Sequence, residues 1–230
     1  DFPAIESILD EVKSILKYHN NFASGEYYYL LARYYYNAKL AGDYNTDTDE
    51  KEKFIKLFNH NINKAIQCMR KARNLNSGQY LGKYYCFKAL VLIKEDMGNP
   101  TEIKKSLDKT KQLIEKHAQP QSKLVRDYNM ACAWYYTYIE HNFIKVQGHI
   151  SEACRITFNI SQTNIDIIDE IISIIKIYSE WGEYKIAIKW IYSSIKLCNS
   201  HKNVLVYLSK EIELLKKWLD ISYKKQDFET

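Results

Sequence analysis

The sequence predicts an all-α fold built from about four pairs of helices, and three observations support this. The chain has 7 glycines and 3 prolines in 230 residues, where average usage would give about 28, and sheet folds need many tight turns. Apolar residues recur at spacings of three and four, and the strict alternation typical of a strand is absent over any useful length. Helix-breaking residues fall at regular intervals.

The breaks divide the chain into segments of helical length. We expect helix pairs near 25–75, 78–118, 122–160 and 164–199, and single helices near 3–19 and 203–226. Gly148 and Gly182 are expected to interrupt the third and fourth pairs. The pairs recur every 35 to 45 residues or so, which is typical of a helical repeat.

The single helix near 203–226 is expected to cap one end of the array, because a stack of helix pairs exposes an apolar end. Its apolar stripe comprises Leu208, Ile212, Leu215 and Leu219. The residues expected to face outward are Lys210, Glu213, Lys216 and Lys217.

Large and small residues alternate in a matching way in the first and last pairs. The last pair has Ile171, Ile174 and Tyr178 before Gly182, and the small residues Ala187 and Ser194 after it. The corresponding residues of the first pair are Tyr27, Leu30, Leu31, Tyr34, Ala65, Met69, Ala72 and Leu75. Small residues allow close approach of two helices, and large ones fill the gaps around the crossing. This pattern resembles the tetratricopeptide repeat (TPR).

The resemblance implies a right-handed α-solenoid of about four TPR-like helix pairs with a terminal capping helix. It implies a single domain over 1–230 whose concave face binds a protein or peptide. The second and third pairs match the pattern poorly. Leu31 and Ile175 also stand where the repeat has a small residue, so we expect wider helix spacing there.

Tyrosine is in excess, with 20 residues clustered at 27–29, 34–36, 84–85 and 135–138. A run of three covers about 200° of a helix, so one ring enters the core and another points elsewhere. With Tyr27 and Tyr34 in the core, Tyr28 and Tyr35 face the concave side, where tyrosine gives a large contact area at low entropic cost. The alternative, that these rings only fill the core, is left open.

The third pair supplies further candidate contacts. One face of its first helix carries Arg126, Asn129 and Tyr136, and such side chains can hydrogen-bond the backbone of an extended peptide. We therefore expect ligand-binding residues at Tyr28, Tyr35, Arg126, Asn129 and Tyr136. A solvated helix face is the alternative for the third pair.

Motifs for catalysis or cofactor binding are absent: the sequence has no GxGxxG, P-loop or GxSxG. The segment 43–49 has the oxygens of a calcium loop, but Thr48 stands where glycine is needed and Phe54 where glutamate is needed. The histidines show no HxxxH and the cysteines no CxxC spacing, and His149 is expected at the surface. We expect no enzymatic activity, no cofactor and no metal.

The chain has five scattered cysteines, an odd number that indicates reduced thiols in a cytoplasmic protein. No stretch is apolar enough to span a membrane. Because the chain begins at Asp1 rather than Met, an upstream segment is left open.

The formal net charge is +5, with acids and bases mixed along the chain, which argues against nucleic acid as the partner. The predicted function is a non-enzymatic scaffold that binds a protein or peptide, with a homodimer left open. One alternative is the peptide-sensing receptor domain of a bacterial transcription regulator, a family that the chain resembles in length and in its terminal helix. The other is an RNA-binding helical repeat.

Overall fold

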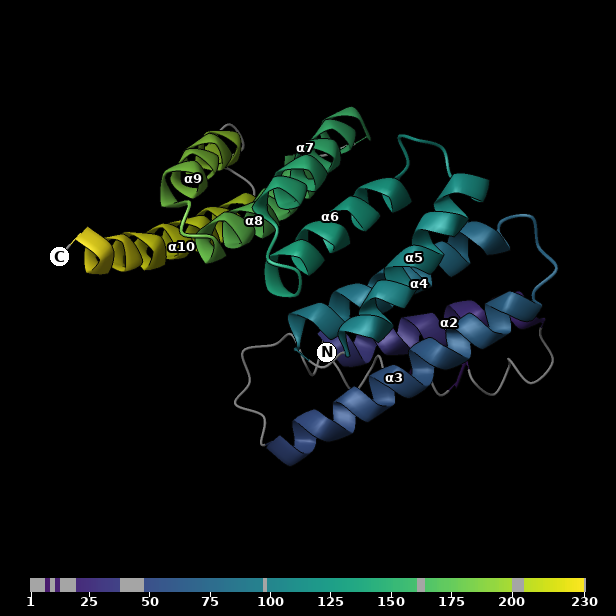
Figure 1. Cartoon of the computed structure of the whole chain (residues 1–230). Helices are drawn as coiled ribbons and strands as arrows, with labels where there is room; N and C mark the ends of the chain where they lie inside the picture. Colours follow the sequence, from purple (N-terminus) through teal and green to yellow (C-terminus); the bar gives the residue numbers. More distant parts are fainter. Residues whose placement is uncertain are drawn as a thin grey trace. The chain divides into compact units, whose positions relative to one another are not determined.

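The structure, a computed structural model, describes residues 7–8, 11–12, 20–37, 48–96, 99–160, 164–199 and 205–229. These residues form α-helices and short connections, with no strand among them (Figure 1). The predicted all-α fold is confirmed. None of the helices in this part of the chain combines the length and apolar character needed to cross a bilayer. Most of the predicted helix at 3–19 and of the acidic segment at 43–49 lies outside the described residues.

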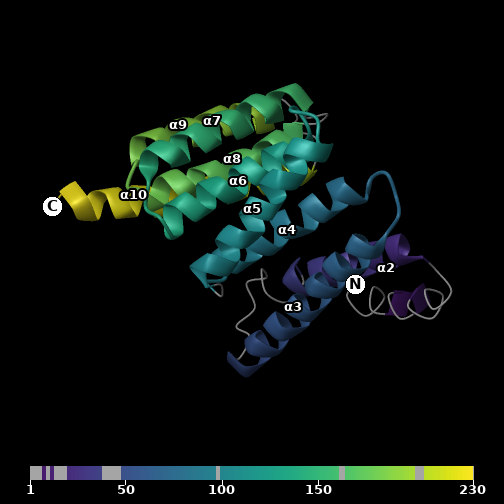
Figure 2. The same ribbon diagram turned by 45° about the vertical axis from the view of Figure 1, so that its right-hand side comes forward.

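The chain divides into two compact units, Asp1–Ala118 and Gln119–Thr230. The helices of the first unit are α2 (Asn21–Tyr35), α3 (Thr48–Lys71), α4 (Ser77–Lys94) and α5 (Pro100–His117). Each of them packs against the next along the chain (Figure 2). The single domain over 1–230 stays a prediction.

Asparagine side chains cap two helices of the first unit. Asn20 Oδ1 accepts a hydrogen bond from the backbone N–H of Ala23 at 3.0 Å, and Asn99 Oδ1 accepts one from Thr101 at 2.9 Å. These bonds satisfy N–H groups that have no partner within the helix. Pro100 follows Asn99 at the start of α5, where its missing N–H removes no helical hydrogen bond.

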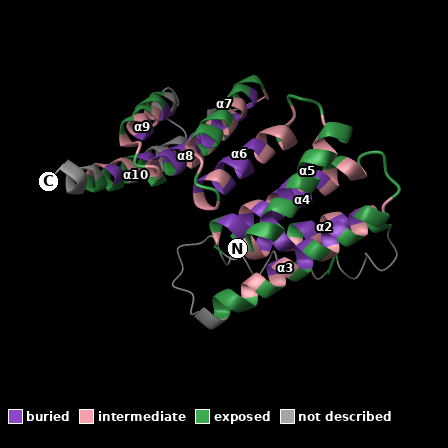
Figure 3. Cartoon of the chain, in the orientation of Figure 1, coloured by how far each residue is buried: buried purple, intermediate pink, exposed green. Residues whose placement is uncertain are grey.

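The core of the first unit is largely aromatic. Phe58, Ile62 and Met69 of α3 are buried together with Tyr29 of α2 and Tyr84 of α4. The rings of Tyr29 and Tyr84 stack with their centroids 4.5 Å apart. Figure 3 shows the buried residues on the sides where these helices face one another.

The tyrosines of α2 divide between buried and half-buried positions. Tyr27 and Tyr34 are buried, with 5% and 9% of their surface exposed. Tyr28 and Tyr35 are half-buried and pack against the same aromatic core. All four rings therefore fill or border the core of the first unit.

The second unit comprises α6 (Lys123–Tyr138), α7 (Phe143–Ile160), α8 (Asn164–Glu180), α9 (Tyr184–Asn199) and α10 (Leu205–Glu229). Consecutive helices pack together, and α8 also contacts α6 and α10, its next-but-one neighbours. In both units the helices match the predicted segments, with outer ends that differ from the prediction by at most four residues.

Two glycines were expected to break helices, and one of them does. Gly182, with φ 71°, lies in the turn between α8 and α9, in a conformation that glycine adopts readily. The prediction for Gly148 is wrong, because α7 continues through it. A glycine inside a helix costs only about 1 kcal/mol relative to alanine. The chain instead turns before α7, where Asn142 Oδ1 accepts a hydrogen bond from Lys145 N at 3.1 Å.

The small residues matched to the repeat are buried. Ala65, Ala187 and Ser194 have no exposed surface, which fits the close helix approach expected at these positions. The match at Leu75 is wrong, because its side chain is fully exposed. The physical reason is that α3 ends at Lys71, so Leu75 lies beyond the helical face that it was expected to extend.

The prediction for the inner face of α10 is also wrong. Ile212, Leu215 and Leu219 are 45–56% exposed, whereas Leu214 and Ile221 are buried. Leu214 and Ile221 are seven residues apart, which is about two helical turns, so they lie on one face. The predicted stripe at Ile212, Leu215 and Leu219 therefore faces away from the core of the second unit. Leu208 lies among residues whose side chains are not described.

Candidate functional site

A groove of about 1020 Å³ runs between α3 and α5 in the first unit, with α4 beneath it. We call it the α3–α5 groove. Its α3 side chains are His60, Asn63, Lys64, Ile66, Gln67 and Arg70. Its α4 side chains are Tyr85 and Lys88, and those from α5 and its cap are Asn99, Thr101, Glu102, Lys105, Ser106 and Lys109.

The groove follows from the amphipathic patterns of α3 and α5. Ile62 and Met69 of α3 are buried, and so are Ile103 and Leu107 of α5. Each helix turns its apolar stripe toward the core, and the polar residues between the apolar ones lie beside the stripe. The two polar borders form the walls of the groove, which explains why amides and cations dominate its lining.

Lys88 joins the three helices of the groove. Its side chain is only 10% exposed, and Nζ lies 2.7 Å from Glu102 Oε1 of α5. Nζ also donates a hydrogen bond to Asn63 Oδ1 of α3 at 3.0 Å. A buried ammonium group needs such partners, because desolvation of an unpaired charge is costly.

Two further cations of the groove contact aromatic rings. Arg70 Nη2 donates a hydrogen bond to the hydroxyl of Tyr85, and the Arg70 Cζ atom lies 5.7 Å from the centroid of that ring. Lys64 Nζ lies 5.1 Å from the centroid of Tyr28. These cation–π contacts orient the side chains without neutralising their charge.

The groove is electropositive. Five cationic side chains line it, and Glu102 is the one carboxylate among the described lining residues. In the part of the chain that the structure describes, no carboxylate forms an ion pair with Lys64, Arg70, Lys105 or Lys109. The amino end of α5, which opens at Asn99 and Thr101, adds the positive end of a helix dipole.

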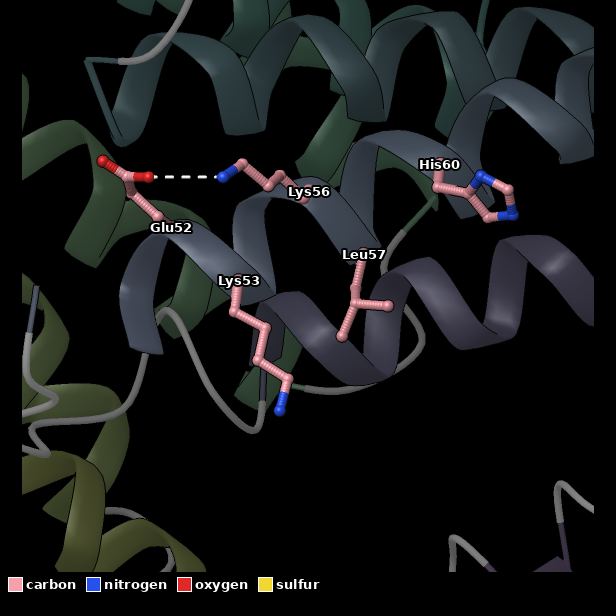
Figure 4. Close-up of a pocket in the computed structure, with 5 residues that line it drawn as sticks. All are labelled: Glu52, Lys53, Lys56, Leu57 and His60. Carbon is pink, nitrogen blue, oxygen red and sulfur yellow. Dashed lines mark hydrogen bonds and ion pairs between the residues drawn. The ribbon is translucent and has the colours of Figure 1, made fainter. Parts of the chain in front are cut away.

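A second hollow, of about 710 Å³, lies along the amino-terminal half of α3. Its lining residues Glu52, Lys53, Lys56, Leu57 and His60 all belong to this helix (Figure 4). Lys56 Nζ lies 3.4 Å from Glu52 Oε2. Figure 4 shows these two side chains facing each other, with Lys53 and Leu57 directed to another side. These side chains diverge, and the exposed ion pair contributes little. The α3–α5 groove is the better candidate site.

The predicted contacts Tyr28 and Tyr35 lie on α2, outside the lining of the α3–α5 groove. Tyr28 borders it through Lys64, whose ammonium group lies over its ring. Tyr35 stacks on Phe54 with ring centroids 6.4 Å apart, which places it at the α2–α3 contact. The other predicted contacts, Arg126, Asn129 and Tyr136, belong to α6 of the second unit.

Asn129 is not on an exposed helix face, as a ligand contact would require. It is 7% exposed, and its Nδ2 donates to the carbonyl of Val125 at 2.9 Å. Its Oδ1 lies 2.8 Å from His149 Nδ1 of α7. Both polar atoms of the amide are therefore engaged within the second unit.

Arg126 and Tyr136 also contact near neighbours. Arg126 donates to Asp127 Oδ1 from Nε at 3.0 Å and from Nη2 at 2.7 Å. Tyr136 stacks on His149 with ring centroids 5.4 Å apart, and Lys145 Nζ lies 4.5 Å from the Tyr136 centroid. The structure thus brings Asn129 and Tyr136 together around one histidine.

The expectation that His149 lies at the surface holds only in part. Its ring is half-buried between Tyr136, at 5.4 Å, and Tyr128, at 6.5 Å. Asn129 and His149 are 20 residues apart and on different helices. Local spacing gives no signal for this contact, because it depends on how α6 and α7 pair.

The cysteines of the described residues form no disulfide, in keeping with their prediction as reduced thiols. Burial raises the pKa of Cys154 to about 11, with a further contribution from the charge of Glu170. Burial also raises the pKa of Cys68. A raised pKa disfavours the thiolate, which is the nucleophilic form. In the described residues, no group of three metal-ligating side chains is assembled.

Comparison with known proteins identified no relative of this chain. No protein-family model matches the chain, and searches of curated proteins and of solved structures found no match.

Proposed function

We propose that this protein is a non-enzymatic scaffold that binds a peptide segment of a partner protein. The observation that carries the proposal is the α3–α5 groove, which has walls on two helices and a floor on a third. Side-chain amides line it at Asn63, Gln67 and Asn99, and amides can both donate to and accept from a peptide backbone. Grooves with convergent polar groups of this kind are suited to ligand binding.

The proposal includes a TPR-like arrangement in the second unit. The contacts of α8 with both α6 and α10 are those expected when helix pairs stack in succession. A right-handed solenoid of such pairs is the proposed architecture. In this reading α10 is the terminal capping helix, with the inner face that Leu214 and Ile221 mark.

The proposed binding surface differs from the surface predicted from sequence. The sequence points to the first helix of each pair, where Tyr28, Tyr35 and Asn129 lie. The groove instead lies between α3 and α5, the second helices of their pairs. We place the ligand there because Asn129 is buried and its polar atoms are engaged, whereas Gln67 and Lys105 are exposed.

The test is a selection of random twelve-residue peptides displayed on phage against the full chain. The groove-blocked variant is Gln67→Trp, in which a large ring enters the groove from an exposed position of α3. The matched control is Gln147→Trp on α7, which is also exposed and lies in the second unit. Circular dichroism checks that both variants are folded.

The proposal expects enriched peptides that bind the wild type and Gln147→Trp but lose binding to Gln67→Trp. Two results would contradict it. Either no peptide is enriched, or the enriched peptides bind Gln67→Trp as tightly as the wild type.

A further inference from the structure

We infer that the α3–α5 groove selects an extended peptide segment that carries two or more Asp or Glu side chains. This inference rests on the proposed function and adds the chemical class of the ligand. The reason is charge complementarity: Lys64, Arg70, Lys105 and Lys109 line the groove, and no carboxylate of the described residues pairs with them. An acidic segment supplies the missing counter-charges.

The groove has the length for such a segment. Along α3 it runs from His60 to Arg70, ten residues further on, which is about 15 Å of helix. An extended chain covers this distance in about five residues. Cations line both walls, with Lys64 and Arg70 on α3 and Lys105 and Lys109 on α5. Acidic side chains on either side of the bound peptide therefore meet a cation.

Glu102 occupies the place that a ligand carboxylate would take. It is the carboxylate beside Lys88, at 2.7 Å, and its own side chain is 50% exposed. An incoming carboxylate competes with it for the Lys88 ammonium group and is repelled by its charge. Removal of this charge therefore strengthens binding of an acidic ligand, which a purely structural role of Glu102 does not predict.

A peptide fits the lining better than a single-stranded nucleic acid. Nucleic acids without base pairing bind through exposed aromatic rings on which bases stack. Tyr85, the phenol ring in the groove, is 8% exposed and hydrogen-bonded to Arg70. The amides of Asn63 and Gln67 instead suit a peptide backbone.

The experiment measures fluorescence anisotropy of three labelled probes with the full chain. The probes are an acidic Glu/Ser octapeptide, a neutral Gln/Ser octapeptide and an oligouridine. The groove variant is Lys64→Gln/Lys105→Gln. The control, Lys111→Gln/Lys116→Gln, makes the same change in net charge at exposed α5 positions outside the lining.

We expect the acidic peptide to bind about tenfold tighter than the neutral one, and the groove variant to weaken it about tenfold. The control variant leaves its affinity unchanged, and Glu102→Gln tightens it roughly threefold.

Equal affinity for both peptides, or equal weakening by the groove and control variants, would overturn the inference. Tighter binding of oligouridine that depends on Lys64 and Lys105 would replace it with a nucleic-acid ligand. If the display selection succeeds while the acidic octapeptide fails to bind, the inference fails and the proposed function stands.

Discussion

The ammonium group of Lys210 lies 2.6 Å from Asp169 Oδ1, and this ion pair joins α10 to α8. Lys210 also contacts Glu213 Oε2 at 3.3 Å within its own helix. The residues four and eleven positions after Lys210 are Leu214 and Ile221, which are buried. Positions at this spacing share one helical face. The pair therefore lies on the face that α10 presents to the rest of the second unit.

This register predicts unequal effects of two adjacent leucines. Leu214→Ala lowers the free energy of unfolding by about 2–5 kcal/mol, because it empties a buried site. Leu215→Ala changes it by less than about 0.5 kcal/mol, because Leu215 is 45% exposed. Urea unfolding followed by circular dichroism measures both. A larger loss of unfolding free energy for Leu215→Ala than for Leu214→Ala would contradict this register and support the buried stripe predicted from sequence.

We predict that Asn129 contributes to folding stability and not to ligand binding. Asn129→Ala removes the side-chain hydrogen bonds to His149 Nδ1 and to the Val125 carbonyl, and we expect a loss of about 1–2 kcal/mol in unfolding free energy. Gln147→Ala, an exposed amide on α7, is the control and changes stability little. If Asn129→Ala unfolds like the wild type but loses peptide binding, Asn129 has the contact role expected from sequence.

The Lys88–Glu102 pair predicts an asymmetry between its two partners. Glu102→Ala leaves the buried Lys88 ammonium group without its carboxylate and lowers the unfolding free energy by about 2 kcal/mol. Lys88→Met costs less than about 1 kcal/mol, because the half-exposed Glu102 is then hydrated. Urea titration of both variants tests this order. The reverse order would mean that Lys88 is not effectively buried.

Stability is predicted to fall in alkaline solution. Burial, together with the charge of Glu95, raises the pKa of Tyr36 from 10.0 to about 12. As the pH rises from about 10 to 12, the unfolded chain loses the phenol proton while the folded chain keeps it, so the unfolded state gains stability. Unfolding free energies at about pH 9 and pH 11 should differ less in Tyr36→Phe than in the wild type. An equal pH dependence would exclude this contribution.

Local patterns in the sequence are sufficient to predict the helical segments. The turn at Gly182 follows from spacing, and the burial of the small residues Ala187 and Ser194 follows from their match to the repeat pattern. The buried face of α10 cannot be predicted in this way, because Ile212, Leu215 and Leu219 form a regular apolar stripe that is nevertheless exposed in the structure. Contacts with other helices, among them the Lys210–Asp169 pair, decide which side is buried.

The candidate groove was not predicted, for a related reason. Its side chains come from three helices, and each set alone looks like the solvated face of an amphipathic helix. Lys88 would be expected in solvent from its residue type. Its burial depends on Asn63 and Glu102, which lie 25 and 14 positions away. Only the packing of α3, α4 and α5 brings these groups together.

Amide NMR of the isotope-labelled chain, titrated with a peptide from the display selection, shows directly whether the peptide binds in the α3–α5 groove. We predict that the largest chemical-shift changes fall within residues 60–70 of α3 and 99–109 of α5, which line the groove. Changes centred on Tyr28 and Tyr35 of α2, or on α6 around Asn129, would contradict binding in the groove and support the surface expected from sequence.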